Sequence, residues 1–547
     1  MNGQYRHVGI SHVMRKCLIT FWVAHNMYLK RLNLKLAMIL FIAAFMHTLI
    51  LLYAYNTDDF VPKHVGATLF LINGFNMPTY VYNIFHQNPA YYGFIAIILH
   101  LTDICEYEVP SFPIVMIPYF FTFFALIYVI SGKSWFSFLL ALLLAIFDMT
   151  SSLCGSYKIF LWPHGLGSIL VYSYILLLYN TIKRGDQRYT ATGLIIIFAL
   201  IFMSYNKAHY LLSILGALLL ISFFKQYGFL FRHIKISFLF FIVVLFGLSK
   251  FVYNTFIPLF AEESSFGPSS PINTFMNRFF TEDKYVVTEL DQLLVKMPEI
   301  FTYLYSVKYA LYVLLILLGF IAILGYKAKK YNGSEYASEY LRPSILIYAS
   351  TVTATVLYMI ARLAVGYFPL PEIYNIVLFS VIVIACVSNS RQHKNNEITR
   401  IFVIGVLVIL IIINLISISI ANEYKILQKD NYNHMVASSN WLHEHYNGSA
   451  YFPDQLTYAW YFITYSNYFD DSKIARYMPI DDIICLYLSK PINKNILVVL
   501  NYRSNYNAIS RGRLTKPFSS FREIVETNPS IEAKIYTYNN DISIILT

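Results

Sequence analysis

Long apolar stretches separated by short polar segments cover most of the first 421 residues of the chain. Runs of about 18 or more apolar residues with few charges are typical of transmembrane helices. Eleven stretches fit this pattern, so the sequence predicts eleven membrane spans. They lie at about residues 36–55, 111–131, 135–151, 165–182, 191–206, 209–224, 236–255, 309–326, 343–361, 373–388 and 401–421.

One further apolar segment, residues 90–102, is too short for a span and suits an interfacial or re-entrant helix. Basic residues support this interpretation, because lysine and arginine concentrate in cytoplasmic segments. If 90–102 does not cross and the N-terminus is cytoplasmic, the inner segments contain 20 lysines and arginines, and the outer ones before residue 422 contain nine. The sequence therefore predicts eleven spans, with the N-terminus inside and the C-terminus outside.

This orientation divides the chain into three parts. Residues 1–35 form a cytoplasmic or interfacial segment, residues 36–421 a membrane domain, and residues 422–547 an extracytoplasmic domain. Two long outer loops are expected, at 56–110 and at 256–308, and the Ser, Gly and Pro content of the second favours a mobile lid. The expected fold is mainly α, a polytopic helical bundle in the plasma membrane with a small C-terminal α/β domain.

The C-terminal part is less apolar, and its patterning is mixed. Met435, Trp441 and Leu442 fall on one face of a predicted amphipathic helix. The segment "NILVVLNY" predicts a buried strand, and "AKIYTYNNDISIILT" predicts a β-hairpin. These elements are the basis of the α/β prediction.

Composition agrees with a membrane protein, because 57% of the residues are hydrophobic and 13% are charged, against about 25% charged in soluble domains. The net charge of +11 is attributed to membrane topology, and no nucleic acid is expected as a partner. The five cysteines have no CxxC spacing, which argues against a disulfide framework or a zinc site. A P-loop, a dinucleotide fingerprint, HExxH and GxSxG are absent from the sequence, which argues against ATP-driven enzymes and soluble-type hydrolases.

Two adjacent acids, Asp58 and Asp59, follow the first predicted span, with Lys63 and His64 soon after. These acids could be solvated loop residues. They could also be catalytic residues, because a carboxylate at the membrane surface can act as a general base or bind a divalent cation.

A second group follows the third span. Asp148 lies near the outer end of this span, where an ionisable residue is a functional candidate or a headgroup-level cap. Lys158 and His164 come next and could meet a phosphate or anchor the chain at the interface.

Further basic candidates lie at outer span ends. Arg362, with Tyr367 close behind it, could bind a lipid phosphate through its planar guanidinium or simply snorkel to the interface. Lys207 and His209 occupy a predicted tight outer turn and could add positive charge beside a phosphate.

The order of these parts resembles integral-membrane glycosyltransferases of the GT-C type, which include protein mannosyltransferases, aminoarabinose transferases and oligosaccharyltransferases. Asp58-Asp59 stands where the mannosyltransferase-like branch carries Asp-Glu after the first span. About thirty residues on, "NPAYYGF" resembles the branch's "PPLYY" stretch. The layout of most of the chain is similar, including the final outer domain.

The resemblance implies transfer of a sugar from a polyprenyl-phosphate carrier to a glycan, lipid or protein acceptor at the outer face. It implies Asp58 as general base with Asp59 beside it, and Asp148 as a second carboxylate. If a divalent cation is present, Mg or Mn, Asp58 and Asp148 would hold it. Arg362 would contact the carrier phosphate, and the segment 90–102 would wall the cavity.

Lys207 and His209 would assist at the phosphate, and His64, Lys158, His164 and Tyr367 complete the expected substrate contacts.

Three alternatives stay open. A polysaccharide polymerase or ligase acting on lipid-linked glycans would depend on Arg362 and not on Asp58. A transporter or flippase would show inverted repeats and midplane charges, and no repeat is visible in the sequence. A catalytically silent scaffold would need neither residue.

Overall fold

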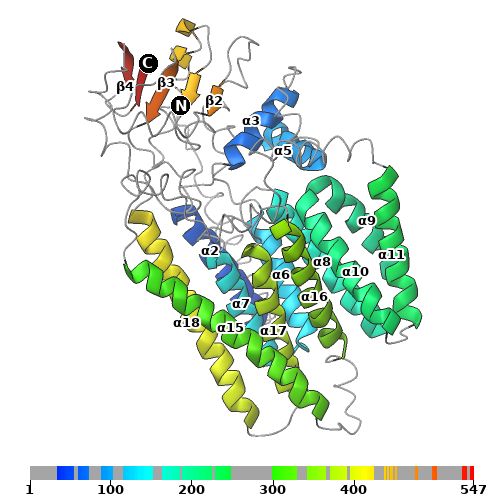
Figure 1. Ribbon diagram of the computed structural model, residues 1–547. Coiled ribbons are helices and arrows are strands. Elements are labelled where there is room, and N and C mark those ends of the chain that lie inside the picture. The colour runs from blue at the N-terminus through cyan, green and yellow to red at the C-terminus, as the bar shows by residue number, and fades with distance from the viewer. Residues whose placement is uncertain are drawn as a thin grey trace, which may run out of the picture. The chain divides into compact units, whose positions relative to one another are not determined.

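The computed structural model describes the helices and strands shown in Figure 1. The described residues are 34–53, 60–72, 88–102, 115–151, 163–184, 188–224, 228–247, 299–328, 342–364, 370–390, 395–423, 437–438, 440–442, 444–446, 450–452, 475–477, 496–501, 533–538 and 542–546. The chain forms two compact units, Met1–Leu49 and Ile50–Thr547. Helix α2 (Leu34–Tyr53) lies largely in the first unit, and all other described elements belong to the second.

The second unit is mainly helical. Its described helices are α3 (Phe60–Ile72), α5 (Pro89–Thr102), α6 (Met116–Ile130), α7 (Trp135–Ser151), α8 (Pro163–Arg184), α9 (Arg188–Met203), α10 (Tyr205–Phe224), α11 (Gly228–Gly247), α15 (Glu299–Ala328), α16 (Arg342–Ala364), α17 (Leu370–Ser390) and α18 (Asn395–Glu423).

Among the described residues, three helices contain a stretch long and apolar enough to cross a membrane: Pro163–Lys183, Ser306–Leu324 and Glu397–Ser419. A shorter apolar stretch, of 10–17 residues, occurs in each of the helices α5, α6, α7, α9, α10, α11, α16 and α17. The fold is therefore helical and compatible with a membrane protein. The count of eleven spans stays a prediction.

Several helices differ from the predicted ranges. Helix α15 begins at Glu299, so the predicted lid ends earlier than residue 308. Helix α11 spans Gly228–Gly247, about two turns earlier than predicted, because the helix already includes Arg232 and Lys235. Long basic side chains can remain in a membrane helix by reaching the interface. Helix α3 lies inside the predicted first outer loop.

Hydrogen bonds between helices show which helix ends lie together. Tyr119, near the start of α6, donates to Asp148, near the end of α7. Tyr172 in the first half of α8 donates to Asn375 near the start of α17. We call this the Asp148 end: α6, α8, α10, α15 and α17 begin there, and α7, α16 and α18 finish there.

The opposite end is defined by Asn389 near the end of α17, and we call it the Asn389 end. The Nδ2 atom of Asn389 lies 2.9 Å from the carbonyl of Ser131, which follows α6. Arg400, in the second turn of α18, donates to Oδ1 of Asn389 over 3.2 Å. Ser344, at the start of α16, donates to the carbonyl of Ile130, the last residue of α6.

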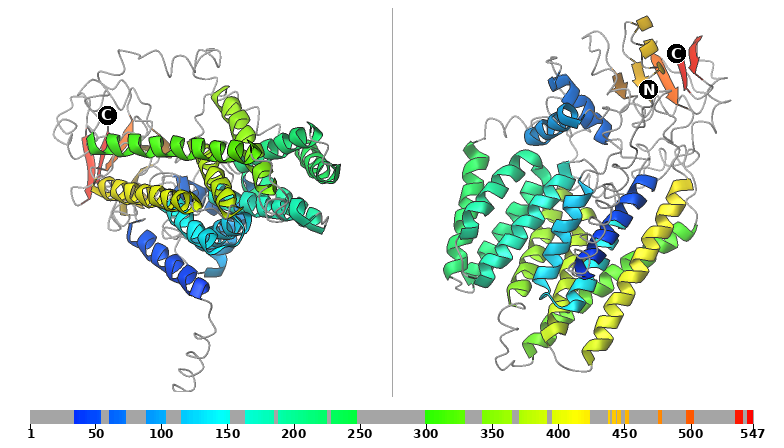
Figure 2. Two further views of the ribbon diagram at one scale, coloured as in Figure 1. Left: turned by 90° about the horizontal axis from the view of Figure 1, so that it is seen from below. Right: turned by 180° about the vertical axis from the view of Figure 1, so that it is seen from behind.

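Small residues allow the closest helix contacts. Gly319 of α15 faces Ser380 of α17, and a Cβ at Gly319 would lie 2.7 Å from the Ser380 Cβ. Helices α10 and α16 are joined through Tyr210 and Thr355, whose hydroxyl oxygens are 3.1 Å apart. Helices α15 and α18 run side by side in both views of Figure 2. Such small-residue contacts suit membrane helices, whose association depends on close packing.

The C-terminal part contains a five-stranded mixed sheet in the order β2-β1-β3-β5-β4. Its strands are β1 (Ala450–Phe452), β2 (Ala475–Tyr477), β3 (Leu497–Asn501), β4 (Ala533–Tyr538) and β5 (Ile542–Leu546). Strand β3 is the predicted buried strand, and β4 and β5 form the predicted antiparallel hairpin. Leu442 is buried, Trp441 is half-buried, and Met435 lies outside the described residues. The outer location of this part stays a prediction.

Candidate functional site

Asp148 is the buried carboxylate of the Asp148 end, with 1% of its surface exposed. The apolar sequence of α7 carries it into the bundle, in the last turn of the helix. The hydroxyl of Tyr119 donates to its Oδ2 atom. Tyr374 of α17 lies within electrostatic range of the same carboxylate. Two tyrosines from two helices therefore surround a carboxylate that burial would otherwise leave poorly solvated.

Lys308 of α15 is the buried amine of the same end, with 8% of its surface exposed. Its Nζ atom donates to Oδ1 of Asn414 on α18 over 2.8 Å. The Nδ2 atom of Asn414 in turn lies 3.2 Å from Oγ1 of Thr150 and 3.4 Å from the carbonyl of Phe147. Asn414 therefore connects the lysine to the last turn of α7, where Asp148 lies.

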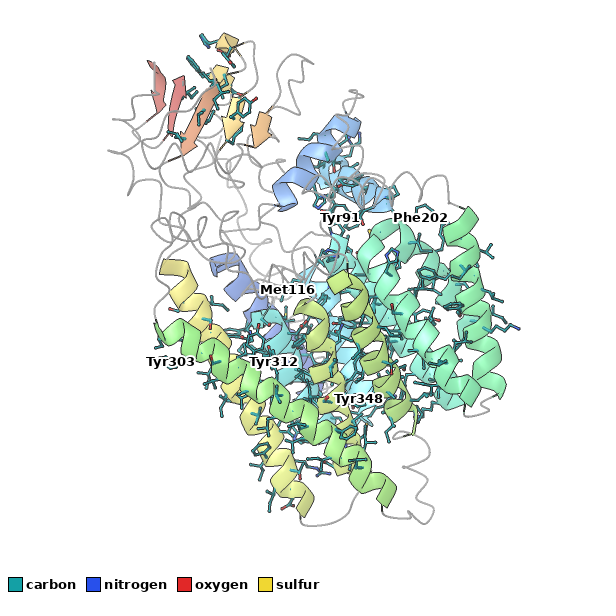
Figure 3. The ribbon with its side chains drawn as sticks, in the orientation of Figure 1. Tyr91, Met116, Phe202, Tyr303, Tyr312 and Tyr348 are labelled. Atoms are coloured by element: carbon teal, nitrogen blue, oxygen red, sulfur yellow. The ribbon has the colours of Figure 1, made fainter. Side chains whose placement is uncertain are left out.

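Aromatic rings fill the space between these polar groups. The ring of Phe147 packs against Tyr312 and Tyr374, with centroids 6.0 and 5.3 Å away. Lys308 lies over the ring of Tyr312, 5.9 Å from its centroid, in a cation–π contact. Figure 3 labels Tyr312 on α15, among the side chains of the bundle. The rings therefore pack α7, α15 and α17 against one another beside these polar groups.

A second polar group lies where α8 begins and α9 meets α10. Lys207 has 7% of its surface exposed. A Cβ at Gly167 would lie 2.9 Å from Cγ of Lys207 and 2.5 Å from Cβ of Ser204, so α8 touches this junction directly. His164, one turn before Gly167, is half-buried, and its carbonyl accepts a bond from Ser168. The structure therefore brings the predicted residues His164 and Lys207 to adjoining helix starts.

The prediction that Lys207 and His209 form a turn is wrong, because both lie in α10, which begins at Tyr205. The break between α9 and α10 falls at Ser204, whose amide still bonds to the Leu200 carbonyl over 2.9 Å. His209 is half-buried, and its carbonyl accepts a bond from Ser213.

Arg362 lies in the last turn of α16, which runs beside α10. It is seven residues after Thr355, the contact residue of Tyr210, so its backbone position falls on the face of α16 that meets α10. Lys207 comes three residues before Tyr210 on α10. Both predicted phosphate contacts therefore come from the Asp148 end of one helix pair.

His64 of α3 is held by the two tyrosines of the "NPAYYGF" segment. Its Nδ1 atom is 2.7 Å from the hydroxyl of Tyr92, and its ring meets Tyr91 edge-on at 5.1 Å. All three side chains are buried, and burial raises the pKa of Tyr92 well above its ordinary value, so Tyr92 stays protonated. Tyr91 is labelled on α5 in Figure 3. These tyrosines thus fix α5 against α3, the helix that follows Asp58 and Asp59.

Four predicted site residues lie outside the described part of the chain: Asp58, Asp59, Lys158 and Tyr367. The described residues contain no group of three or more His, Cys, Asp or Glu side chains able to hold a metal ion. The predicted cation pair, Asp58 and Asp148, includes one of the residues outside this part.

Sequence reasoning missed Lys308, Asn414 and Tyr119. Lys308 fell one residue before a predicted span, where a lysine is normally an interfacial anchor. The signal that could have found it is Asn414, an amide within the most apolar of the three candidate membrane-spanning stretches in the described residues. A polar residue at such a position usually has a buried partner on another helix.

Comparison with known proteins gives no assignment: no family model matches the chain, and no curated protein matches it.

Proposed function

We propose that this chain is a membrane glycosyltransferase that moves a sugar from a polyprenyl-phosphate donor to a glycan, lipid or protein acceptor at the outer face. The acceptor hydroxyl attacks the anomeric carbon, the bond from that carbon to the phosphate oxygen breaks, and the configuration inverts. Asp58 takes the hydroxyl proton, and the polyprenyl phosphate leaves with the bonding electron pair.

One observation carries this proposal. A buried carboxylate, Asp148, and two buried amines, Lys207 and Lys308, lie at the same end of a helical bundle. Charged groups inside a membrane bundle are costly and usually serve a function. A lipid-linked sugar phosphate needs both kinds of group, because cations stabilise the departing phosphate and a carboxylate orients or deprotonates the acceptor.

The roles follow from position in the chain. Arg362 and Lys207, from adjoining helices, supply positive charge for the phosphate, and His164 and His209 lie close to the same helix starts. Asp148 is the second carboxylate of the site. The α3–α5 pair, joined by His64 and Tyr92, follows Asp58 in the chain. Asp59, Lys158 and Tyr367 complete the proposed site.

The test uses the full chain purified in lipid, supplied with polyprenyl-phosphate sugars carrying a labelled sugar. We expect Asp58→Asn to lower transfer by about 100-fold or more, since general base catalysis typically contributes that much. Arg362→Ala should weaken donor binding. The matched control is Glu397→Gln, which removes an exposed carboxylate at the Asn389 end and should leave transfer unchanged.

The outcomes separate the alternatives. Undiminished transfer in Asp58→Asn would overturn the base assignment. Dependence on Arg362 without dependence on Asp58 would favour a polymerase or ligase acting on lipid-linked glycans. Failure to bind any polyprenyl-phosphate donor would overturn the proposed class.

The buried position of Asp148 and Lys308 within the helices favours a transporter as the second candidate, because ionisable groups inside a bundle mark ion and proton paths. Vesicles containing the protein and an internal pH dye would distinguish the two. Proton flux that Asp148→Asn abolishes, in a protein that transfers no sugar, would establish the transporter.

A further inference from the structure

Asn414 of α18 is a fully buried amide that joins three helices at the Asp148 end. Its Oδ1 atom accepts a hydrogen bond from Nζ of Lys308 on α15, over 2.8 Å. Its Nδ2 atom donates to α7, to Oγ1 of Thr150 over 3.2 Å and to the carbonyl of Phe147 over 3.4 Å. These two acceptors lie on either side of Asp148 in the chain, so the amide binds the turn of α7 that carries this carboxylate.

The orientation of this amide follows from what its partners can donate or accept. A carbonyl only accepts, so the amide atom that faces Phe147 has to be the nitrogen. The hydroxyl of Thr150 has one hydrogen and donates it to the same carbonyl over 2.9 Å, so its oxygen accepts from Asn414. The amide oxygen is thereby turned toward α15, where Lys308 donates to it. Groups on two other helices therefore fix one orientation of the amide.

Apolar contacts support the same connection between α15 and α7. Lys308 lies over the ring of Tyr312, one turn further along α15, at 5.9 Å from its centroid. That ring, labelled in Figure 3, packs edge-on against Phe147 with centroids 6.0 Å apart. Phe147 therefore meets α15 through its side chain and α18 through its carbonyl.

Helices α7 and α18 also meet near their other ends. There the guanidinium of Arg400 lies over the ring of Phe136, 5.3 Å from its centroid. Phe136 is fourteen residues before Thr150 on α7. Arg400 is likewise fourteen residues before Asn414 on α18, about 21 Å along either helix. The two helices therefore run in the same direction and in register, with one of these contacts at the Asn389 end and the other at the turn of Asp148.

We propose that Asn414, oriented by Lys308, is a positioning residue that fixes the last turn of α7 and with it the side chain of Asp148. A reacting group works only from the correct position, and a displacement of about 1 Å can lower a rate by about 100-fold. The contact with α7 does not depend on the reaction, whereas its effect on sugar transfer rests on the proposed function.

The first test compares sugar transfer by variants of the full chain in lipid. Asn414→Leu should lower kcat by about tenfold or more with little change in KM for the donor, because it displaces a reacting group and leaves the phosphate contacts in place. Thr150→Val should lower kcat less, because the Phe147 carbonyl still accepts from the amide. The double variant should be no slower than Asn414→Leu, since both changes remove one contact. Thr150→Ser, which keeps the hydroxyl, should retain the wild-type kcat.

Arg400→Leu is the matched control, because it breaks the contact of the same two helices at the Asn389 end. It should destabilise the protein, since oxygens of Asn389 and Ser388 lose a donor, but kcat per folded molecule should not change. Equal losses of kcat in Arg400→Leu and Asn414→Leu would overturn the positioning role, because a general loosening of the bundle would then explain both.

Hydrogen exchange of the backbone amides of residues 148–151 provides a second test that needs no substrate. Asn414→Leu should speed exchange at these amides by about tenfold or more relative to the rest of the bundle, because the turn opens locally more often. Arg400→Leu should not. Unchanged exchange at these amides in Asn414→Leu would overturn the proposal, whatever the transfer assay shows. A wild-type protein that transfers no sugar would instead count against the proposed function, and faster exchange in Asn414→Leu would still support the contact with α7.

Discussion

The two ends of the helical bundle join their helices through different kinds of polar group. At the Asn389 end, hydroxyls, amides and backbone carbonyls close around a tight turn in which Gly132 and Lys133 have left-handed backbone, with φ of 99° and 57°. Arg400, a charged residue at this end, donates to Asn389 and to the Ser388 carbonyl. At the Asp148 end, the buried members include a carboxylate and two amines.

This difference in polar groups suggests a structural role for one end of the bundle and a functional role for the other. Neutral polar groups that hydrogen-bond to one another add stability at a low desolvation cost, because no ion has to leave water. Buried ions add little stability relative to apolar residues, and their presence points to another role. The Asn389 end is therefore interpreted as a structural joint, and the Asp148 end as the working end.

The largest expected effect is on activity at the Asp148 end. Asp148→Asn keeps the shape and an acceptor for Tyr119 but removes the charge, so sugar transfer should fall by about 100-fold or more. Initial rates per folded molecule measure this. Glu397→Gln, the carboxylate control at the other end, should change the rate by less than about twofold, since an exposed helix-start acid contributes only tenths of a kcal/mol. Equal losses in both variants would contradict the division of roles.

The next largest effect is on stability at the Asn389 end. Asn389→Leu removes an amide whose Nδ2 atom lies within 3.0 Å of acceptors on Ser131, Ser134 and Ser137. It should destabilise the protein by about 2 kcal/mol, because those acceptors and Arg400 lose a partner. The rate per folded molecule should not change. Unfolding in lipid, together with the transfer assay, measures both, and a lower rate at full folding would contradict this prediction.

Much of the fold could be predicted from the sequence, because a membrane helix is encoded locally. Helix α7 has the predicted bounds, 135–151, and each of the other predicted spans overlaps a described helix. Helix α3 was missed because Lys63 and His64 interrupt a segment too short for a span. Local hydropathy does not show that a helix in a loop can bury such residues against another helix, as His64 does against Tyr92.

The site was less predictable, because its contacts join distant parts of the chain. Asp148 was found from its place at a span end, but its surroundings come from Tyr119 and Tyr374 on two other helices. Asn414 binds Thr150 across more than two hundred residues of sequence. Pairings of this kind depend on which helices are neighbours, and a single sequence does not contain that information.

A glycine contact gives a smaller effect that again distinguishes the two roles. A Cβ added in Gly167→Ala would lie 2.5 Å from Ser204 Cβ, closer than real contacts allow, so α8 and the α9–α10 junction must separate. We expect a loss of about 1–3 kcal/mol and reduced donor binding, because Lys207 moves as well. Gly405→Ala is the control: its Cβ meets nothing within 4 Å, and the better helix propensity should stabilise the protein slightly. Normal donor affinity in Gly167→Ala would exclude this junction from the site.

The smallest effects come from removing one hydroxyl at each end. Ser344→Ala removes a donor to the Ile130 carbonyl, but the Cys386 thiol also donates to that carbonyl, over 3.2 Å, so the loss should stay below about 1 kcal/mol with no change in rate. Tyr119→Phe should cost more, about 1–3 kcal/mol, because the buried Asp148 carboxylate loses a hydrogen-bond donor, although the ring still stacks on Phe123. It should also lower the transfer rate, by about fivefold to tenfold, since that carboxylate loses the hydroxyl that orients it. If both variants altered only stability, Tyr119 would be as structural as Ser344, and the working end would have to be sought around Lys207 and Arg362 rather than Asp148.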